Sequence, residues 1–202
     1  MLDAKLRPLI DPPLDRAARH LVLLGVQPHA ITLTGFGVGL VAIPALAAEL
    51  YGVALALIAI NRVADGLDGS VARQSAAVSD LGGFLDILGD FIFYAAVPLG
   101  FALARPENAV AAAFLIFSFV GTGASFLAYA VVAAKRGLAG GASGPKSLYY
   151  LGGLTEGSET IAAFVAFCLL PELFPWLAYA FGALCWVTTV SRLSAAVRDF
   201  GH

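Results

Sequence analysis

Apolar segments long enough to cross a lipid bilayer dominate this sequence. A membrane-spanning helix needs about 20 consecutive, mostly apolar residues. Turn signals such as "ARPEN" and "LPELFP" separate several of these segments. Their approximate bounds are 31–50, 51–64 (running on into the charged stretch that follows), 81–104, 109–134, 158–170 (running on toward 174) and 176–196. We therefore expect an all-α integral membrane protein whose six transmembrane helices form one bundle over residues 31–202.

The overall composition agrees with a chain that is solvated by lipid. Hydrophobic residues make up 59% of the sequence and charged residues 13%, against about 25% charged residues in an ordinary soluble domain. The net charge is small and negative, −2, so the chain has no basic field suited to nucleic acid, and none is expected as a partner. Cys168 and Cys185 lie inside apolar runs, where we expect them to be small buried hydrophobes rather than a disulfide or metal pair.

The segment before the first span is charged and interrupted by prolines, so we do not expect a signal peptide there. Four apolar residues recur in it at nearly helical spacing, among charged ones: Leu14, Ala18, Leu21 and Leu24. This pattern predicts an amphipathic interfacial helix within residues 1–30, on the cytoplasmic face. A role for this helix in gating lipid entry stays an open alternative. The whole chain, 1–202, then forms a single membrane domain.

The distribution of lysine and arginine predicts the orientation in the membrane. With six spans both termini lie on one side, and basic residues favour cytoplasmic loops. Only Arg105 falls on the opposite side. The other eleven of the 12 basic residues fall on the side of the termini: Lys5, Arg7, Arg16, Arg19, Arg62, Arg73, Lys135, Arg136, Lys146, Arg192 and Arg198. We expect a multi-pass inner membrane protein with its termini and the 65–90 stretch in the cytoplasm.

Five aspartates interrupt the apolar sequence in "DGLDGSVARQSAAVSDLGGFLDILGD", residues 65–90. One isolated aspartate at mid-membrane costs about 2.5–3.5 kcal/mol, so several together need a positive partner. Asp65 and Asp68 are three residues apart, and Asp86 and Asp90 four apart, so each pair shares one helix face. Faces on adjacent antiparallel helices can converge into one carboxylate cluster, and such oxygen ligands suit Mg²⁺ or Mn²⁺. Asp80 is expected at the rim, as a helix N-cap.

The neighbours of these aspartates are consistent with a ligand site. Arg73 is expected at the cytoplasmic rim, where it can pair with a phosphate, and Arg62 is expected to pair with an aspartate. Small residues let helices or a ligand approach the backbone closely. The stretch contains Gly66, Gly69, Ala72, Gly82 and Gly83.

Written with its gaps, the stretch reads D-x2-DG-x2-AR-x8-G-x3-D-x3-D over 26 residues. At every fixed position and gap it resembles the signature of the CDP-alcohol phosphotransferase (CDP-alcohol phosphatidyltransferase) family. Eight fixed residues make this resemblance specific, and the six-span layout extends it over nearly the whole chain. One departure is at Pro28-His29, where many members have Pro-Asn before the first span.

The resemblance implies a metal-dependent transferase of phospholipid biosynthesis. Family members move a substituted phosphate from a CDP-linked donor, in bacteria commonly CDP-diacylglycerol, to an alcohol, and they release CMP. The resemblance also implies two divalent cations, Mg²⁺ or Mn²⁺, and a homodimer. By position it assigns metal binding to Asp65, Asp68, Asp86 and Asp90, general-base catalysis to Asp90, and the CDP donor site to Gly69, Ala72, Arg73 and Gly82.

The acceptor alcohol is not readable from the motif. Lys146, Arg136 and Arg192 are candidates for binding it, although their charges also fit simple orientation or snorkelling in the membrane. Glu156 and Glu159 open the fifth span, where the helix dipole favours acids and acceptor recognition is the alternative.

Two other classes of protein stay open from the residues alone. An intramembrane prenyltransferase also holds pyrophosphate with aspartates and magnesium, and "NRVAD" imitates one of its elements, but no second aspartate cluster follows. An ion or proton transporter would spread its acids over several spans, whereas here they are confined to two.

Overall fold

The structure, a computed structural model, describes residues 2–137 and 153–201. Every regular element in this part of the chain is helical, which confirms the all-α prediction. The elements in order are α1 (Leu2–Leu23), α2 (Pro28–Ala47), α3 (Tyr51–Gln74), α4 (Asp80–Ala104), the 3₁₀ turn η1 (Pro106–Asn108), α5 (Ala109–Lys135), α6 (Gly157–Leu169), the 3₁₀ turn η2 (Pro171–Leu173) and α7 (Phe174–Phe200).

Four segments of the described chain are long and apolar enough to cross a membrane: Pro28–Ala47, Asp80–Ala104, Pro106–Lys135 and Pro171–Phe200. The chain is thus a multi-pass membrane protein. The predicted count of six spans is not established, for two reasons. Helix α3 runs unbroken to Gln74, through the aspartate stretch into which we expected this segment to continue, and carries charges toward its C-terminal end. Helix α6 has 13 residues, or about 20 Å, against a hydrocarbon core of about 30 Å.

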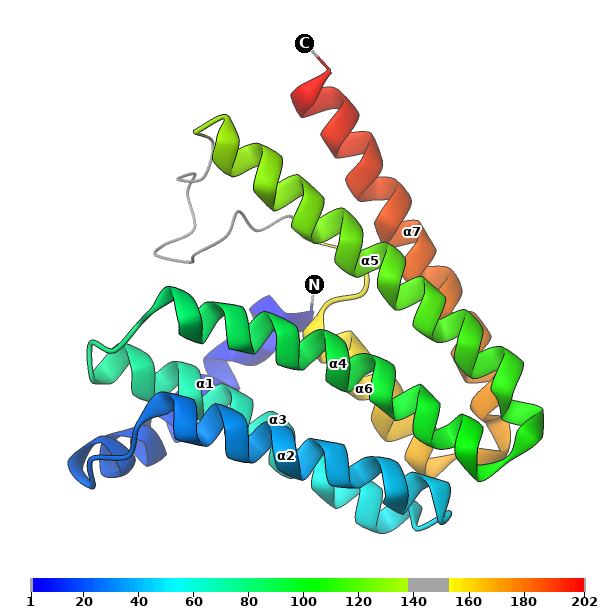
Figure 1. The fold of residues 1–202 in the computed structure, drawn as a ribbon, viewed down its shortest axis with the longest axis horizontal. Helices are drawn as coiled ribbons and strands as arrows, with labels where there is room; N and C mark the ends of the chain where they lie inside the picture. The colour runs from blue at the N-terminus through cyan, green and yellow to red at the C-terminus, as the bar shows by residue number, and fades with distance from the viewer. Residues whose placement is uncertain (1, 138–152, 202) are drawn as a thin grey trace.

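The helices form two groups, a first group of α1–α4 and a second of α5 and α7 (Figure 1). Helix α2 packs along both α3 and α4, whose backbones approach each other only sparsely. Helices α5 and α7 pack on each other and cross the first group at an angle, with α4 contacting α5. Helix α2 therefore acts as the common support that holds α3 and α4 side by side.

Glycines on one face of α2 set the distance to its neighbours. A Cβ atom added at Gly35 would lie 2.5 Å from the Cβ of Ala64 on α3. One added at Gly39 would lie 2.7 Å from Nδ2 of Asn61 and 3.0 Å from the ring of Phe93 on α4. The two glycines are four residues apart, the spacing that lets helix backbones approach closely in membranes.

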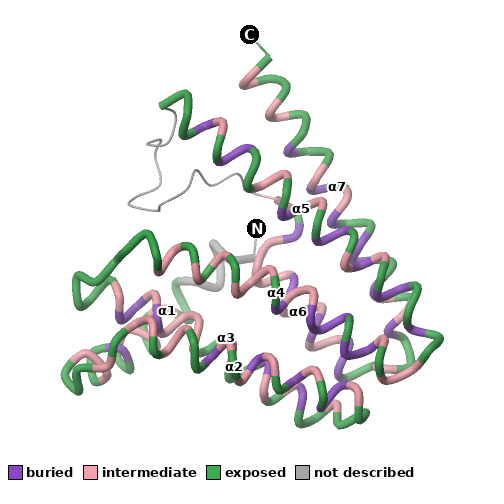
Figure 2. The backbone as a smooth tube through the Cα atoms, viewed as in Figure 1, coloured by how far each residue is buried: buried purple, intermediate pink, exposed green. Residues whose placement is uncertain are grey.

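Aromatic side chains fill the interior farther along the bundle. Phe101 on α4 stacks on Phe174 of α7 with ring centroids 4.4 Å apart, and it forms a T-shaped pair with Phe167 of α6 at a centroid distance of 6.0 Å. Cys168 and Cys185 are buried and not joined in a disulfide, as expected. Figure 2 shows buried residues where helices face one another and exposed ones along the outer sides. Many of the exposed residues are large and apolar, a surface suited to lipid.

One basic residue closes the end of the bundle opposite the aspartates. The Nη2 atom of Arg105 lies 2.7 Å from Glu49, in the turn between α2 and α3, and Nη1 lies 2.7 Å from Glu172 in η2. The hydrogen bond from Arg105 lowers the pKa of the Glu49 carboxyl from its ordinary value. Arg105 thus links three helix ends on the side where we expected a single basic residue.

Helix α1 packs against α3 at the level of the aspartate motif. Ala18 is fully buried, and a Cβ at Gly66 would lie 2.6 Å from a methyl group of Leu14. Ser70 on α3 donates a hydrogen bond to the carboxylate of Asp15. Much of the apolar face predicted for α1 therefore contacts protein, whereas Leu24, beyond its end, is exposed. A location of α1 in the membrane interface stays a prediction.

The close approach of α2 to α3 can be tested with two glycines of the same helix. Gly35→Ala should destabilise the protein by about 1–3 kcal/mol, because the new methyl group forces the two helices apart. Gly37→Ala is the matched control, since a Cβ there meets nothing within 4 Å. Thermal unfolding of the purified variants in detergent measures the difference, and equal melting temperatures would contradict this account.

Candidate active site

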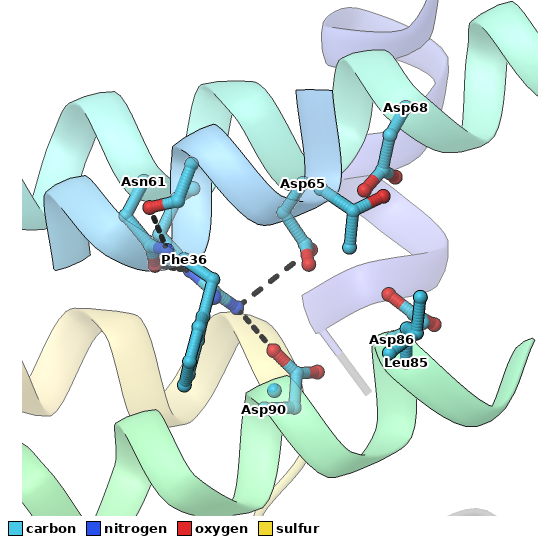
Figure 3. Close-up of a pocket in the computed structure, with 11 residues that line it drawn as sticks. Phe36, Asn61, Asp65, Asp68, Leu85, Asp86 and Asp90 are labelled. Carbon is cyan, nitrogen blue, oxygen red and sulfur yellow. Dashed lines mark hydrogen bonds and ion pairs between the residues drawn. The ribbon is translucent and has the colours of Figure 1, made fainter. Parts of the chain in front are cut away.

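A cavity between α3 and α4, with α2 as one wall, collects the acidic residues of the motif (Figure 3). It contains about 260 Å³ of empty space, which includes its opening to the outside. Four of the five aspartates of the 65–90 stretch share it. The residues that line the cavity are Thr32, Gly35 and Phe36 from α2, Asn61, Arg62, Asp65 and Asp68 from α3, and Leu85, Asp86, Gly89 and Asp90 from α4.

Helix α3 presents Asp65 and Asp68 to the cavity from one face. The helix continues past residue 64 without a break, so the three-residue spacing places both carboxylates on the same side. Asp68 is only 7% exposed. Among the described residues none forms a hydrogen bond with its buried Oδ2 atom. A buried carboxylate oxygen without a donor is costly, so this oxygen requires a cation or a bound donor.

Helix α4 presents Asp86 and Asp90 from the other side of the cavity. It begins after Ser79, whose Oγ accepts a hydrogen bond of 3.1 Å from the backbone N–H of Gly82. Ser79 is therefore the N-cap, and the prediction of Asp80 for that position is wrong by one residue. Asp80 is exposed in the first turn of α4, where its negative charge interacts favourably with the helix dipole.

Arg62 lies between the two helices and confirms the expected pairing with an aspartate. Its Nη1 atom is 2.7 Å from Oδ1 of Asp90 and 3.6 Å from Oδ2 of Asp65, contacts drawn as dashed lines in Figure 3. Its Nε donates to Oδ1 of Asn61 at 2.8 Å, and Nδ2 of Asn61 donates to the carbonyl of Gly35 at 2.8 Å. A continuous chain of hydrogen bonds thus connects α2, α3 and α4.

The side chains of the cavity fit a divalent cation by their chemistry. The four carboxylates supply only oxygen ligands, which suit Mg²⁺ and Mn²⁺, and the buried Oδ2 of Asp68 is placed to meet a positive charge. Within residues 2–137 and 153–201, no three side chains of Asp, Glu, His or Cys lie close enough together to form a ready coordination site. Two of the carboxylates, Asp65 and Asp90, are instead drawn toward the guanidinium of Arg62.

The remaining motif residues lie around the cavity rather than in its lining. Gly69 and Ala72 follow Asp68 on α3, and the exposed Arg73 folds back so that its Nη1 would be 3.3 Å from a Cβ at Gly69. A Cβ at Gly82 would meet Ser79 Oγ at 3.3 Å, within its own helix cap. The N-cap residue Ser79 therefore limits the space beside Gly82. Contacts between these motif residues and a CDP-linked donor remain predictions.

The three basic residues predicted for the acceptor are not gathered together at the cavity. Lys146 lies outside the described residues. Arg136 is exposed and donates to the carbonyls of Asp199 and Phe200 at 3.4 and 2.9 Å, at the C-terminal end of α7. Arg192 is buried between α7 and α5, where its Nη1 donates to the carbonyl of Thr122 at 2.9 Å. Neither described arginine lines the aspartate cavity.

Glu156 and Glu159 have a structural role at the start of α6. They form a capping box, in which the carboxylate of Glu159 accepts a hydrogen bond of 3.2 Å from the backbone N–H of Glu156. This agrees with the preference of acids for a helix N-terminus.

Several lining residues were not identified from the sequence. Thr32, Gly35 and Phe36 belong to α2 and lie about thirty residues before the motif, with no charge to mark them. Asn61 and Arg62 were easier to recognise as candidates than these α2 residues, because a polar pair inside an apolar segment requires partners, and Asn61 is buried.

Sequence comparison finds relatives over almost the whole chain. The sequence profile of the CDP-alcohol phosphatidyltransferase family matches residues 26–191. The inner membrane protein YnjF of Escherichia coli is 53% identical over 194 residues, which cover 96% of this chain and 94% of YnjF. The archaetidylinositol phosphate synthase of Pyrococcus horikoshii is 35% identical over 100 residues, covering 50% of this chain and 53% of that protein.

Solved structures share the fold at low sequence identity. The phosphatidylinositol phosphate synthase PgsA1 of Mycobacterium tuberculosis with CDP-DAG bound has a TM-score of 0.68 at 18% identity, covering 91% of this chain and 93% of PgsA1. The same enzyme in complex with manganese and citrate has a TM-score of 0.66 at 19% identity, covering 90% and 87%. With a profile match of this extent and a close full-length relative, the chain belongs to the CDP-alcohol phosphatidyltransferase family.

Proposed function

We propose that this protein transfers the phosphatidyl group of CDP-diacylglycerol to an alcohol acceptor and releases CMP. The observation that carries the proposal is the single cavity shared by Asp65, Asp68, Asp86 and Asp90, which have the spacing of the family signature. The related structure that contains CDP-DAG supports this donor. The prenyltransferase and transporter alternatives lose their basis with the family match.

The donor is proposed to bind beside the cavity, along the last turns of α3. Gly69 and Ala72 present little side-chain volume there, so a nucleotide can approach the helix backbone. Arg73 at the exposed end of α3 supplies a positive charge for a donor phosphate. We place Gly82 on the opposite side of the same opening. The acyl chains of the donor would stay in the bilayer.

We infer that the four aspartates hold two divalent cations, Mg²⁺ or Mn²⁺, and the manganese complex of the related structure supports this. When bound, such ions neutralise the pyrophosphate oxygens and stabilise the departing CMP. Asp68 would contribute its buried Oδ2, which otherwise has no donor among the described residues. Asp65 and Asp86 would complete the set from the two facing helices, with Asp90 at its edge.

Asp90 is proposed to be the general base. The acceptor hydroxyl oxygen attacks the phosphorus that carries the diacylglycerol, and the bond from this phosphorus to the oxygen of CMP breaks. The acceptor proton passes to the carboxylate of Asp90, and CMP leaves with the bonding electron pair. A positioned general base of this kind contributes about 10²–10⁴-fold to a rate.

The acceptor is proposed to enter from the side of α5–α7. Two relatives are inositol phosphate synthases by name, so an inositol phosphate is the first acceptor to test. A phosphorylated acceptor requires a cation, and Lys146, Arg136 and Arg192 are the candidates. Arg192 is the described candidate whose guanidinium is buried, whereas that of Arg136 is at the end of α7.

We further propose that the whole chain forms one membrane domain that crosses the inner membrane six times and assembles as a homodimer. In this arrangement α3 and α6 complete the four longer spans, and α1 lies at the cytoplasmic interface. The aspartate cavity and both termini then face the cytoplasm, as the basic residues indicate.

Purified protein mixed with CDP-diacylglycerol, Mn²⁺ or Mg²⁺ and an alcohol should release CMP in amounts equal to the phospholipid formed. A panel of inositol phosphate, glycerol 3-phosphate and serine identifies the acceptor, and chelation of the metal should abolish turnover. CMP is measured by chromatography. Failure to release CMP with any acceptor, while prenyl pyrophosphate is consumed, would refute the proposal.

Asp90→Asn should lower kcat by about 10²–10⁴-fold, because the amide cannot accept the acceptor proton. Binding of CDP and Mn²⁺, measured by calorimetry, should be retained, since three carboxylates remain. Asp80→Asn is the matched control, because Asp80 is exposed and outside the cavity lining. An active Asp90→Asn enzyme would remove Asp90 from the role of base.

The proposed orientation predicts that a reporter fused after His202 lies in the cytoplasm. A C-terminal fluorescent protein should fluoresce, and a C-terminal alkaline phosphatase should be inactive. A matched fusion that ends at Glu107 should give the opposite result, since Arg105 marks the far side of the membrane. The reverse pattern would contradict the cytoplasmic active site, and the same result from both fusions would contradict the six-span count.

A further inference from the structure

Arg62 is the cationic side chain among the described residues that line the cavity. It is not one of the eight fixed residues of the family signature. It lies one helical turn before Asp65, and its side chain is 15% exposed. A guanidinium held among four carboxylates, inside the reaction cavity, requires an explanation beyond the signature.

The guanidinium of Arg62 is held in one place by groups from two helices. Its Nε bonds to Asn61, which is itself fixed to the backbone of Gly35. The ring centroids of Phe93 and Tyr94 on α4 lie 4.8 and 5.8 Å from its central carbon, within the range of cation–π contacts. An arginine anchored in this way loses little further freedom when it binds a carboxylate.

The two oxygens of Asp90 have different surroundings. Oδ1 accepts a hydrogen bond of 2.7 Å from Nη1 of Arg62. Oδ2 lies 3.5 Å from the hydroxyl of Tyr94, at the outer limit of hydrogen bonding. One oxygen is therefore firmly bound, whereas the other is left with a weak contact in a residue that lines the cavity.

We propose that Arg62 is a positioning residue for the general base: it fixes the Asp90 carboxylate through Oδ1 so that Oδ2 is presented to the acceptor hydroxyl. The inference rests on the proposed function and adds a residue to its machinery. Arg62 does not itself take the proton. It restricts rotation of the carboxylate, and misplacement of a catalytic group by about 1 Å costs on the order of 10²-fold in rate.

The test compares Arg62→Met, Asp90→Asn and the double variant with the wild-type enzyme, using CMP release with CDP-diacylglycerol and Mn²⁺. Arg62→Met should lower kcat by about 10²-fold, with less than threefold change in KM for donor and acceptor. In the Asp90→Asn background the same substitution should change kcat by less than twofold, because the group it positions is already gone. Mn²⁺ binding, followed by electron paramagnetic resonance, should be no weaker than in wild type.

Arg105→Met is the matched control, since it also removes an arginine that joins helices by ion pairs, but at the far end. It should lower thermal stability and leave kcat within twofold. If Arg62→Met fails to fold, Arg62→Lys decides: its single ammonium keeps the charge but cannot hold Asn61 and Asp90 together, so kcat should fall at least fivefold.

Four results would overturn the proposal: kcat within twofold of wild type in the folded Arg62 variant, additive losses in the double variant, a rise in KM alone, or weaker Mn²⁺ binding. The last two would make Arg62 a substrate or metal-site residue. A wild-type enzyme that releases no CMP would instead refute the proposed function, and this inference with it.

Discussion

The ion pair between Arg62 on α3 and Asp90 on α4 is the interaction on which the arrangement of the site depends. Charges among apolar helices are costly unless they are paired and hydrogen-bonded. Arg62 meets both conditions, through Asp90, Asp65 and the amide of Asn61. One cation still leaves most of the negative charge of the four aspartates uncompensated. The surplus lies at Asp68 and Asp86, where the buried oxygen of Asp68 has no donor among the described residues.

Most helices and the two aspartate faces could be predicted from the sequence, because apolar length and helical spacing are local properties. The errors came where local signals conflict. The charges after residue 64 left the C-terminal end of α3 open, and the helix continues to Gln74. Arg62 pairs with Asp65 in this part of the helix, and Ser70 donates a hydrogen bond to Asp15 of α1. The shortness of α6 follows from Pro171, which begins a 3₁₀ turn.

The wall that α2 contributes to the cavity could not be predicted, because it arises from long-range packing. Thr32 and Phe36 carry no pattern that relates them to aspartates about thirty to sixty residues later. The related fold at 18% identity shows how few positions this architecture constrains. The residues that would bind an acceptor are still harder to predict. Arg136 and Arg192 each donate a hydrogen bond to a backbone carbonyl, which is a sufficient structural reason for their positions.

The glycines of α2 give the protein a fixed spacer between its two acidic helices. Because Gly35 and Gly39 lack a Cβ atom, α2 can lie close to both α3 and α4, and this close approach determines the width of the cavity. Helices α5 and α7 form a separate pair that contacts the other helices mainly through α4. The two groups can therefore change at different rates over evolution. If the acceptor enters beside α5 and α7 as proposed, new side chains there can suit a different alcohol, while the spacing between the two acidic helices stays constant.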